Sequence, residues 1–122
     1  MADSILRDKS KDFAKRIVFA CRKIKTEQHE TVLANQLLRC GTSIGANIHE
    51  AQYAQGTKDF ISKLEISLKE CYESEYWLDL LHETGFLADE AYQPLRADCG
   101  TIRRMLISSV TTVKKKQRVT GI

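Results

Sequence analysis

Apolar residues recur every three or four positions along most of the 122-residue chain. In an α-helix this spacing places side chains on one face, whereas a half-buried β-strand alternates apolar and polar residues. Such alternation does not occur here over any useful length. The pattern therefore limits the chain to helices that bury their apolar faces against one another.

Breaks in the pattern divide the chain into four expected helices, at about residues 4–25, 29–55, 57–84 and 90–116. The expected core includes Ile17, Ile44, Leu78 and Leu106, one residue from each helix. Short linkers make sequential helices antiparallel neighbours. We therefore predict a single all-α domain over residues 1–122, folded as an antiparallel up-down-up-down four-helix bundle.

Glycine and proline indicate where these helices end. Gly56 is expected to end the second helix in a left-handed conformation, and Thr57 to cap the next helix. Gly85 is expected to end the third helix, with Phe86 folding back as the apolar contact of that cap. Pro94 leaves the start of the fourth helix open, because proline fits a first turn but clashes in an interior.

No residue pattern indicates a catalytic or metal site. A di-iron bundle needs carboxylates on all four helices and two Glu-x-x-His pairs, but the chain has only Asp79-x-x-His82. The other histidines, His29 and His49, form no metal-binding pair with it. P-loop and nucleophile-elbow sequences do not occur either. We expect a protein that is not an enzyme and has no metal or cofactor.

The cysteines and the apolar runs indicate a cytoplasmic protein. The cysteines contain no C-x-x-C pair, so we expect buried free thiols in a reducing compartment. The N-terminal residues are charged, and no apolar run approaches the ~18 residues of a membrane span. The cysteines are Cys21, Cys40, Cys71 and Cys99.

Charge is distributed unevenly along the chain. Residues 1–30 include eight basic and five acidic residues. Residues 57–93 include three basic and nine acidic residues, and residues 94–122 include seven basic residues and one acidic residue. An up-down bundle places its first and fourth helices side by side, so their positive charges form one surface that ends in a basic tail at 114–122. Such a surface is typical of a nucleic-acid partner. The alternative is a solvated face that meets an acidic face on a neighbouring subunit.

Two glycines lie four residues apart in the expected second helix, in "RCGTSIGANIHEA". Each costs a helix about 1 kcal/mol relative to alanine. Because Gly41 and Gly45 share a face, they allow another helix backbone to approach closely. Ser43 and Asn47 are able to hydrogen-bond across this contact or back to their own helix. The close crossing lies either inside the bundle or between subunits.

Acidic and aromatic residues of the third helix indicate ion pairs and an interface. Glu75 lies at the edge of the apolar stripe and needs a partner, for which Arg16 and Arg39 are candidates. Ion pairing is favoured over catalysis. Because Tyr76 and Trp77 are adjacent, they cannot both face one core, so one of them is expected to anchor an interface.

The stretch from residue 35 to 81 resembles the bacterial four-helix-bundle proteins encoded within 23S rRNA intervening sequences. "FAKRIV" at Phe13 and "RRML" at Arg103 extend the resemblance over nearly the whole chain. The elements that carry it are Gln36, Arg39, Ser43–Ile48, Glu50, Ala51, Asp59, Phe60, Lys69, Glu70, Glu73 and Tyr76–Leu78.

The resemblance implies a ring-shaped homopentamer of four-helix bundles with a ribosomal or RNA-binding role. A related branch is the accessory protein of diversity-generating retroelements, a basic pentamer that binds the reverse transcriptase and nucleic acid. A ring also agrees with the charge pattern, because a basic face and an acidic helix on each subunit allow head-to-tail contacts.

Our first hypothesis is a non-catalytic, ring-forming adaptor that binds structured RNA. The alternative is a protein–protein scaffold whose partner is a reverse transcriptase or another enzyme, and a metal or small-molecule enzyme ranks last. The expected phosphate-binding residues are Arg16, Lys23, Arg96, Arg103, Arg104, Lys114, Lys115 and Lys116. The expected interface or structural residues are Arg39, Gly41, Gly45, Asn47, Glu50, Glu70, Glu73, Tyr76 and Trp77. Charge reversal at Arg103 and Arg104 is expected to weaken RNA binding and leave the oligomer intact.

Overall fold

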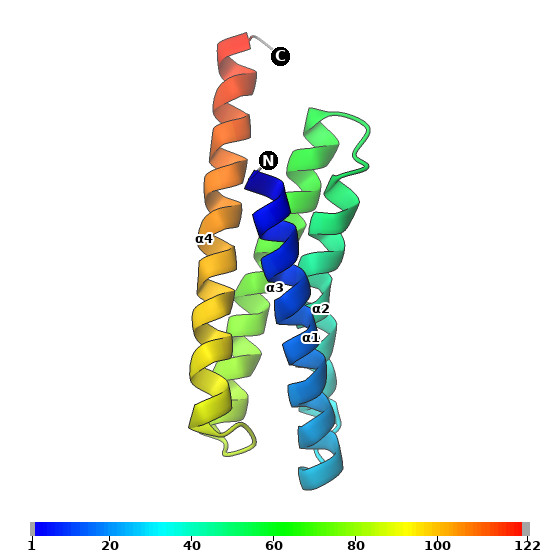
Figure 1. The fold of residues 1–122 in the computed structure, drawn as a ribbon, viewed down its shortest axis with the longest axis vertical. Helices are drawn as coiled ribbons and strands as arrows, with labels where there is room; N and C mark the ends of the chain where they lie inside the picture. Colours follow the sequence, from blue (N-terminus) through cyan, green and yellow to red (C-terminus); the bar gives the residue numbers. More distant parts are fainter. Residues whose placement is uncertain (1, 121–122) are drawn as a thin grey trace.

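A computed structural model describes residues 2–120 of the chain, so residues 121 and 122 of the expected basic tail lie outside it. The described residues form four helices and contain no strand (Figure 1). They are α1 (Ala2–Gln28), α2 (Val32–Ala51), α3 (Thr57–Glu83) and α4 (Asp89–Thr120). The predicted all-α four-helix bundle is confirmed.

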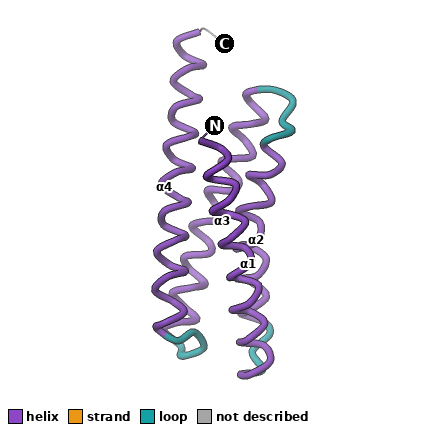
Figure 2. The backbone as a smooth tube through the Cα atoms, viewed as in Figure 1, coloured by secondary structure: helices purple, strands orange, loops and turns teal. Residues whose placement is uncertain are grey.

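The helices form a closed ring of neighbours. Each helix packs against the next one in the sequence, and α1 also packs against α4. The chain runs alternately up and down, and the connecting loops lie only at the two ends of the bundle (Figure 2). The last turns of α4 project beyond the start of α1 and the α2–α3 loop (Figure 1). The basic residues of 114–118 lie in the last turns of α4, and Lys114 there reaches Glu65 of α3 at 2.8 Å.

One hydrophobic core runs along the bundle axis. Ile17, Ile44, Leu78 and Leu106, each expected to face inward, are fully buried. Burying a side chain of this size contributes about 1.5–3 kcal/mol of transfer free energy, so packing of the four apolar faces holds the helices together. Within the described range, none of the helices is both long and apolar enough to cross a membrane.

The second helix is shorter than the range 29–55 read from the sequence. α1 continues to Gln28, and His29 has a left-handed backbone (φ 57°) that ends it. α2 begins at Val32, where the carboxylate of Glu30 accepts a 2.8 Å hydrogen bond from the N–H of Leu33. This carboxylate satisfies one of the N–H groups that the first turn of a helix leaves unpaired.

Of the two glycine caps, the one at Gly56 was wrong and the one at Gly85 is confirmed. Gly56 is extended (φ 160°, ψ 175°) and does not end α2 in a left-handed turn. It occupies the N-cap position of α3, so the cap expected at Thr57 was also wrong, and Thr57 is the first residue of the helix. Gly85 is left-handed (φ 86°). The N–H of Phe86 donates to the carbonyl of Leu81 at 2.9 Å, and the Phe86 ring packs against the core. This is the Schellman arrangement, which satisfies carbonyls at a helix end.

Pro94 lies inside α4, which begins earlier, at Asp89. The first helical hydrogen bond runs from the N–H of Tyr92 to the carbonyl of Ala88, at 2.9 Å. Because Pro94 has no N–H, the helix lacks the backbone hydrogen bond that position 94 would otherwise donate. Because the residue is exposed and close to the helix start, α4 continues past it without a break.

Candidate nucleic-acid interface

Gly41 and Gly45 face α1 within the same subunit. A Cβ atom built on Gly41 would lie 2.9 Å from Cγ2 of Ile17, and one on Gly45 would lie 3.2 Å from the backbone oxygen of Ser10. Real Cβ atoms do not approach other heavy atoms as closely as the first of these distances. The close crossing is therefore an intramolecular one, between α1 and α2.

Polar residues beside the glycines bond mostly within their own helix. The Asn47 amide donates to the carbonyl of Ser43 at 2.9 Å and to its hydroxyl at 3.0 Å. The Thr42 hydroxyl donates to the carbonyl of Leu38 at 2.7 Å. Glu50 instead accepts a 2.9 Å bond from Lys63 and links α2 to α3. Asn47 and Glu50 thus have structural contacts inside the subunit.

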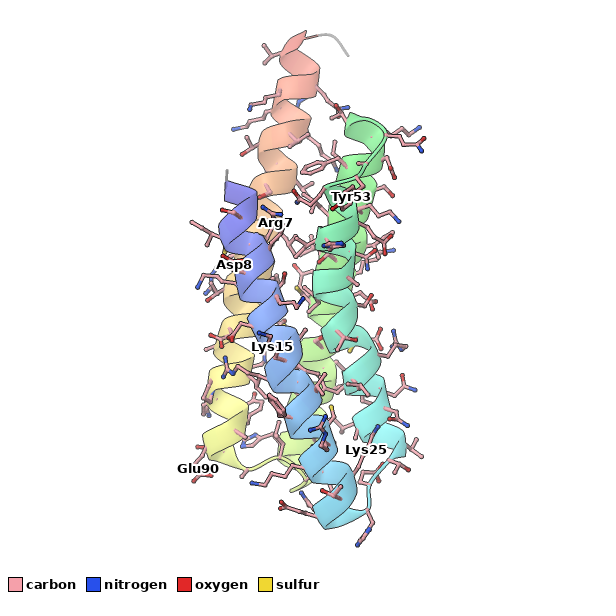
Figure 3. All side chains as sticks on the ribbon, turned by 45° about the vertical axis from the view of Figure 1, so that its right-hand side comes forward. Arg7, Asp8, Lys15, Lys25, Tyr53 and Glu90 are labelled. Carbon is pink, nitrogen blue, oxygen red and sulfur yellow. The ribbon has the colours of Figure 1, made fainter. Side chains whose placement is uncertain are left out.

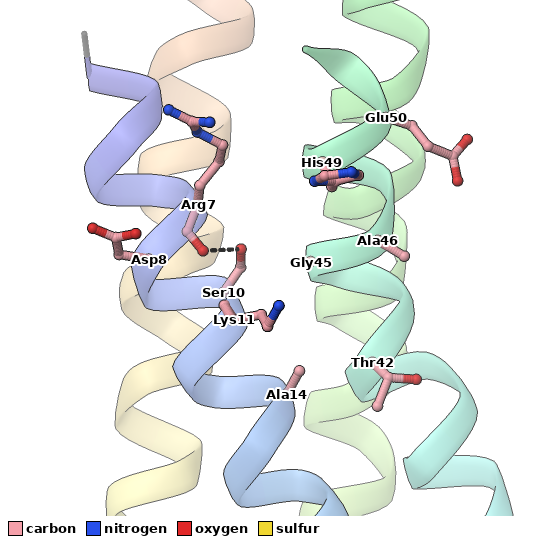
Figure 4. A pocket seen from close by; sticks show the side chains of 10 residues that line it. All are labelled: Arg7, Asp8, Ser10, Lys11, Ala14, Thr42, Gly45, Ala46, His49 and Glu50. Atoms are coloured by element: carbon pink, nitrogen blue, oxygen red, sulfur yellow. Dashed lines mark hydrogen bonds between the residues drawn. The ribbon is translucent and has the colours of Figure 1, made fainter. Parts of the chain in front are cut away.

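A groove of about 590 Å³ lies beside Gly45, between α1 and α2. Figure 4 shows Lys11 and His49 directed toward the space between the helices, while Asp8 and Glu50 point away from it. From the sequence, Lys11 was not considered and His49 was considered only as a metal ligand, because only the packing defines which sides of α1 and α2 face each other.

Glu75 binds two arginines of α4. Glu75 is 8% exposed, and its carboxylate accepts a hydrogen bond from Nε of Arg103 at 2.9 Å, while Nη1 of Arg96 lies 3.0 Å away. The expected partners, Arg16 and Arg39, were therefore wrong. The edge of α3 that carries Glu75 faces α4, whereas those two arginines lie on α1 and α2.

This pair extends into a cluster along the α3–α4 seam. Nε of Arg96 donates to Asp79 at 2.9 Å, and the Tyr92 hydroxyl donates to the same oxygen at 2.6 Å. The His82 ring stacks on the Tyr92 ring, with centroids 3.9 Å apart. These contacts join side chains from one end of the seam to its middle.

The charges of this seam cluster offset one another. Burial acts to raise the pKa of Asp79, but hydrogen bonds from Tyr92 and Arg96 outweigh it and lower that pKa below its ordinary 3.8. The hydrogen bond to Glu75 raises the pKa of Arg103. Two carboxylates and two guanidinium groups give no net charge, so this cluster stabilises the fold more than it attracts an anion.

Arg39 occupies the opposite seam, between α2 and α3. It forms ion pairs with Glu70, at 3.4 Å, and with Glu73. Nε1 of Trp77 donates to Glu73 at 2.9 Å, and its ring packs against the core. Tyr76 is 60% exposed. Of the two adjacent aromatic residues, Trp77 faces the bundle and Tyr76 faces solvent.

The structure separates the eight expected phosphate-binding residues into two groups. Arg16 pairs with Asp98, Arg96 and Arg103 pair with Glu75, and Lys114 lies 2.8 Å from Glu65. The second group is defined by exposure alone and consists of Lys23, Arg104, Lys115 and Lys116.

These exposed residues are not all in one place. Lys23 belongs to the end of α1, and Lys115 and Lys116 belong to the end of α4, which lie at opposite ends of the bundle (Figure 1). Arg104 lies between them and bonds to the Thr101 hydroxyl at 3.2 Å. A site at the shared α1–α4 seam would therefore bring together few of the expected residues.

Basic residues instead follow α1 along its whole length. Figure 3 labels Arg7, Lys15 and Lys25, which come from the start, the middle and the end of this helix. Within the described residues, these three and Lys23 form no ion pair with a carboxylate. We call the solvent-facing side of α1 between residues 15 and 25 the α1 basic face; it follows the exposed Asp8 and Asp12 on the same side of the helix.

The described cysteines are buried and carry no disulfide. The Ser74 hydroxyl donates to Sγ of Cys40 at 3.3 Å, and the Cys99 thiol donates to the carbonyl of Cys71 at 3.5 Å. Burial raises the pKa of Cys21 to about 12 and that of Cys40 to about 11. Over residues 2–120, histidine, cysteine and acidic side chains form no group of three that could hold a metal ion.

Comparison with known proteins identifies the family. The family model described as 23S rRNA-intervening sequence protein matches residues 2–108. The chain belongs to this family. A solved protein shares the four-helix fold of this intervening-sequence family member. A crystal structure of a protein of unknown function from the S23 ribosomal protein family of Bacteroides thetaiotaomicron VPI-5482 is 48% identical, with a TM-score of 0.88.

That similarity covers 91% of this chain and 99% of the solved chain. It therefore extends over the whole bundle and is not limited to a local motif. Among the curated proteins, none matches this member of the intervening-sequence family.

Proposed function

We propose that the chain is a non-catalytic, ring-forming cytoplasmic protein that binds structured RNA through the α1 basic face. The observation that carries this proposal is which charged side chains form ion pairs within the subunit and which do not. Carboxylates of α3 are paired inside the subunit, whereas Lys15, Lys23 and Lys25 have no ion pair within the described range. Unpaired cations on one helix attract a polyanion such as RNA.

The same pairing favours RNA over a neighbouring subunit as the partner of these cations. Five acidic residues of α3 already have basic partners in their own subunit: Glu65, Glu70, Glu73, Glu75 and Asp79. The acidic helix of a second copy thus has little unpaired charge to offer. We propose that the pentameric ring implied by the family resemblance forms through other contacts, with the α1 basic face left for RNA.

The test is binding of a labelled structured RNA across a salt series, on protein shown by light scattering to be one defined oligomer. The expected result is an affinity that falls steeply with salt, because each phosphate contact adds about 0.7–0.9 to the log–log slope. The variant Lys15→Glu/Lys23→Glu is expected to weaken binding and reduce the slope, and its oligomer mass should stay unchanged.

A matched control is Lys58→Glu/Lys69→Glu, which makes the same charge change at exposed lysines of α3. Equal loss of affinity in the control and the α1 variant would show that only net charge matters. Absence of binding by the wild type at about 50 mM salt would contradict the RNA proposal. Arg103 is unsuitable for this test, because its charge reversal would also break the pair with Glu75.

A second candidate function is a protein–protein scaffold, such as an accessory subunit of a retroelement reverse transcriptase. Tyr76 supports it, because this ring is 60% exposed on α3, far from the α1 basic face in the helix order, and aromatic residues are enriched at interfaces. Tyr76→Ala should then weaken capture of such an enzyme without changing RNA affinity. Loss of the pentameric assembly in this variant would assign Tyr76 to the subunit contact.

A further inference from the structure

Phe19 is an exposed aromatic residue in the middle of the α1 basic face. Its side chain is 61% exposed, whereas Ile17 and Cys21, two residues to either side, are buried in the core. Two residues correspond to about 200° around a helix axis. The Phe19 ring therefore points away from the bundle and adds nothing to its core.

The four helical neighbours of Phe19 are all basic. Lys15 and Arg16 precede it by four and three residues, and Arg22 and Lys23 follow it by three and four. Residues at these spacings lie next to each other on a helix surface. The Arg22 guanidinium carbon is 5.6 Å from the centroid of the Phe19 ring. Arg16 is held by Asp98 and lies 3.9 Å from Asp12, but the other three have no ion pair within the described residues.

An exposed flat ring between cations matches the chemistry of an unpaired nucleotide. A nucleobase stacks on an aromatic ring through its π-face, and its two flanking phosphates need cations on either side. Lys15 and Lys23 lie about 6 Å before and after Phe19 along the helix axis, since each residue adds about 1.5 Å. In paired RNA the bases are stacked on one another and are not available to such a ring.

We propose that Phe19 is a stacking platform for an unpaired nucleobase, with Lys15, Arg22 and Lys23 binding the phosphates on either side. The inference rests on the proposed RNA function and deepens it by naming the substrate class. The RNA then carries a single-stranded loop or bulge at the α1 basic face. A second copy of the chain is a weaker occupant, because the described carboxylates of its acidic helix are largely paired within the subunit.

The experiment compares two RNA probes of equal length and charge, a hairpin with an unpaired loop and a fully paired duplex. Phe19→Ala is expected to weaken hairpin binding about 5- to 150-fold, the range for loss of one base–aromatic stack. Its duplex affinity and salt slope should equal those of the wild type, because no charge is removed. Tyr53→Ala is the matched control, since it removes a ring that is 74% exposed outside the α1 basic face.

A second variant gives a direct signal. Phe19→Trp keeps a stacking ring and is expected to bind the hairpin as tightly as the wild type. Its fluorescence should be quenched by the hairpin more than that of the wild type, whose single tryptophan is Trp77. The duplex should cause no such excess quenching.

The outcomes separate this inference from the proposed function. If both RNAs bind equally and Phe19→Ala binds like the wild type, the stacking platform is overturned and the RNA function stands. If neither RNA binds the wild type at about 50 mM salt, both are overturned. If Phe19→Ala changes the oligomer mass measured by light scattering, the Phe19 side chain belongs to a subunit contact and the inference is again overturned.

Discussion

Nε of Arg103 lies 2.9 Å from Oε2 of Glu75, and this contact joins α4 to a residue of α3 that is only 8% exposed. A guanidinium group in a basic stretch is an obvious candidate for binding phosphate. Here it neutralises the buried charge of Glu75. Arg96, two turns earlier on the same helix, contacts the same carboxylate. Arg96 and Arg103 thus serve the fold first, whereas Lys15, Lys23 and Lys25 of the α1 basic face have no ion pair within the described residues.

Removing Glu75 should destabilise the bundle. Glu75→Ala leaves Arg96 and Arg103 half-buried without their shared partner, and breaking a fully buried pair costs about 3–5 kcal/mol. Because both arginines partly reach solvent, we expect a loss of about 2 kcal/mol in the free energy of unfolding in urea. Glu83→Ala, at an exposed glutamate of α3, should change it by less than about 0.5 kcal/mol. Equal stability of the two variants would contradict the structural role of Glu75.

Alanine should have opposite effects at two buried glycines. In Gly41→Ala the new methyl group meets the branched Ile17 side chain at 2.9 Å, so overpacking should cost about 1–3 kcal/mol. In Gly100→Ala it meets the ends of two flexible side chains, Arg104 at 3.3 Å and Arg103 at 3.6 Å. That variant should gain up to about 1 kcal/mol of helix propensity. Thermal unfolding measures both changes, and a stabilised Gly41→Ala would disprove the close crossing.

A double-mutant cycle gives the control for Gly41. Ile17→Ala alone should be destabilising because it leaves a cavity. In the Ile17→Ala background, however, Gly41→Ala should cost less than it does in the wild type, since the atoms it meets are gone. Strict additivity of the two changes would mean that the two residues do not touch.

The buried thiols should react only after the bundle opens. Burial raises the pKa of Cys21 to about 12 and that of Cys40 to about 11, so both stay protonated near neutral pH, and the thiolate is the reactive form. Labelling by a thiol reagent should therefore be slow in the native protein and accelerate with urea in parallel with global unfolding. Rapid labelling of the native protein would contradict the packing around these cysteines.

Stability should also fall at alkaline pH. The folded pKa values of Cys21 and Cys40 lie above the ordinary 9.0, so the folded state holds these protons more tightly than the unfolded state. Their contribution is complete below 9.0 and is lost as pH rises toward the folded values. Urea unfolding at a series of alkaline pH values measures this loss, which should be smaller in Cys21→Ala.

At acidic pH the free energy of unfolding should instead decrease as pH falls, and Asp79 contributes to this loss. Because its folded pKa lies below 3.8, the folded state binds this proton less tightly than the unfolded state. The stabilisation is present above 3.8 and is lost as pH falls through the folded value. Asp79→Asn should therefore show a shallower loss of stability between about pH 5 and pH 2 than the wild type. Identical acid profiles would mean that Tyr92 and Arg96 do not stabilise the ionised carboxylate.

The sequence by itself determined what depends on neighbours within one helix. The spacing of Ile17, Ile44, Leu78 and Leu106 placed each in the core, because helical periodicity orients side chains without reference to other helices. Gly85 ended α3 for a similarly local reason, since a left-handed cap needs only the residues around it. At Gly56 the same rule was wrong, because the loop after α2 let the chain enter α3 through an extended backbone.

The tertiary structure alone decided which helix faces which. Spacing showed that Glu75 needs a partner and that Gly41 permits a close approach, but not that Arg103 and Ile17 supply them. Those partners depend on how each helix is rotated about its axis and shifted along it in the packed bundle, which is set by the fit of all four apolar faces together. The pattern of basic residues around Phe19 was readable in the sequence, but its exposure followed only from that packing.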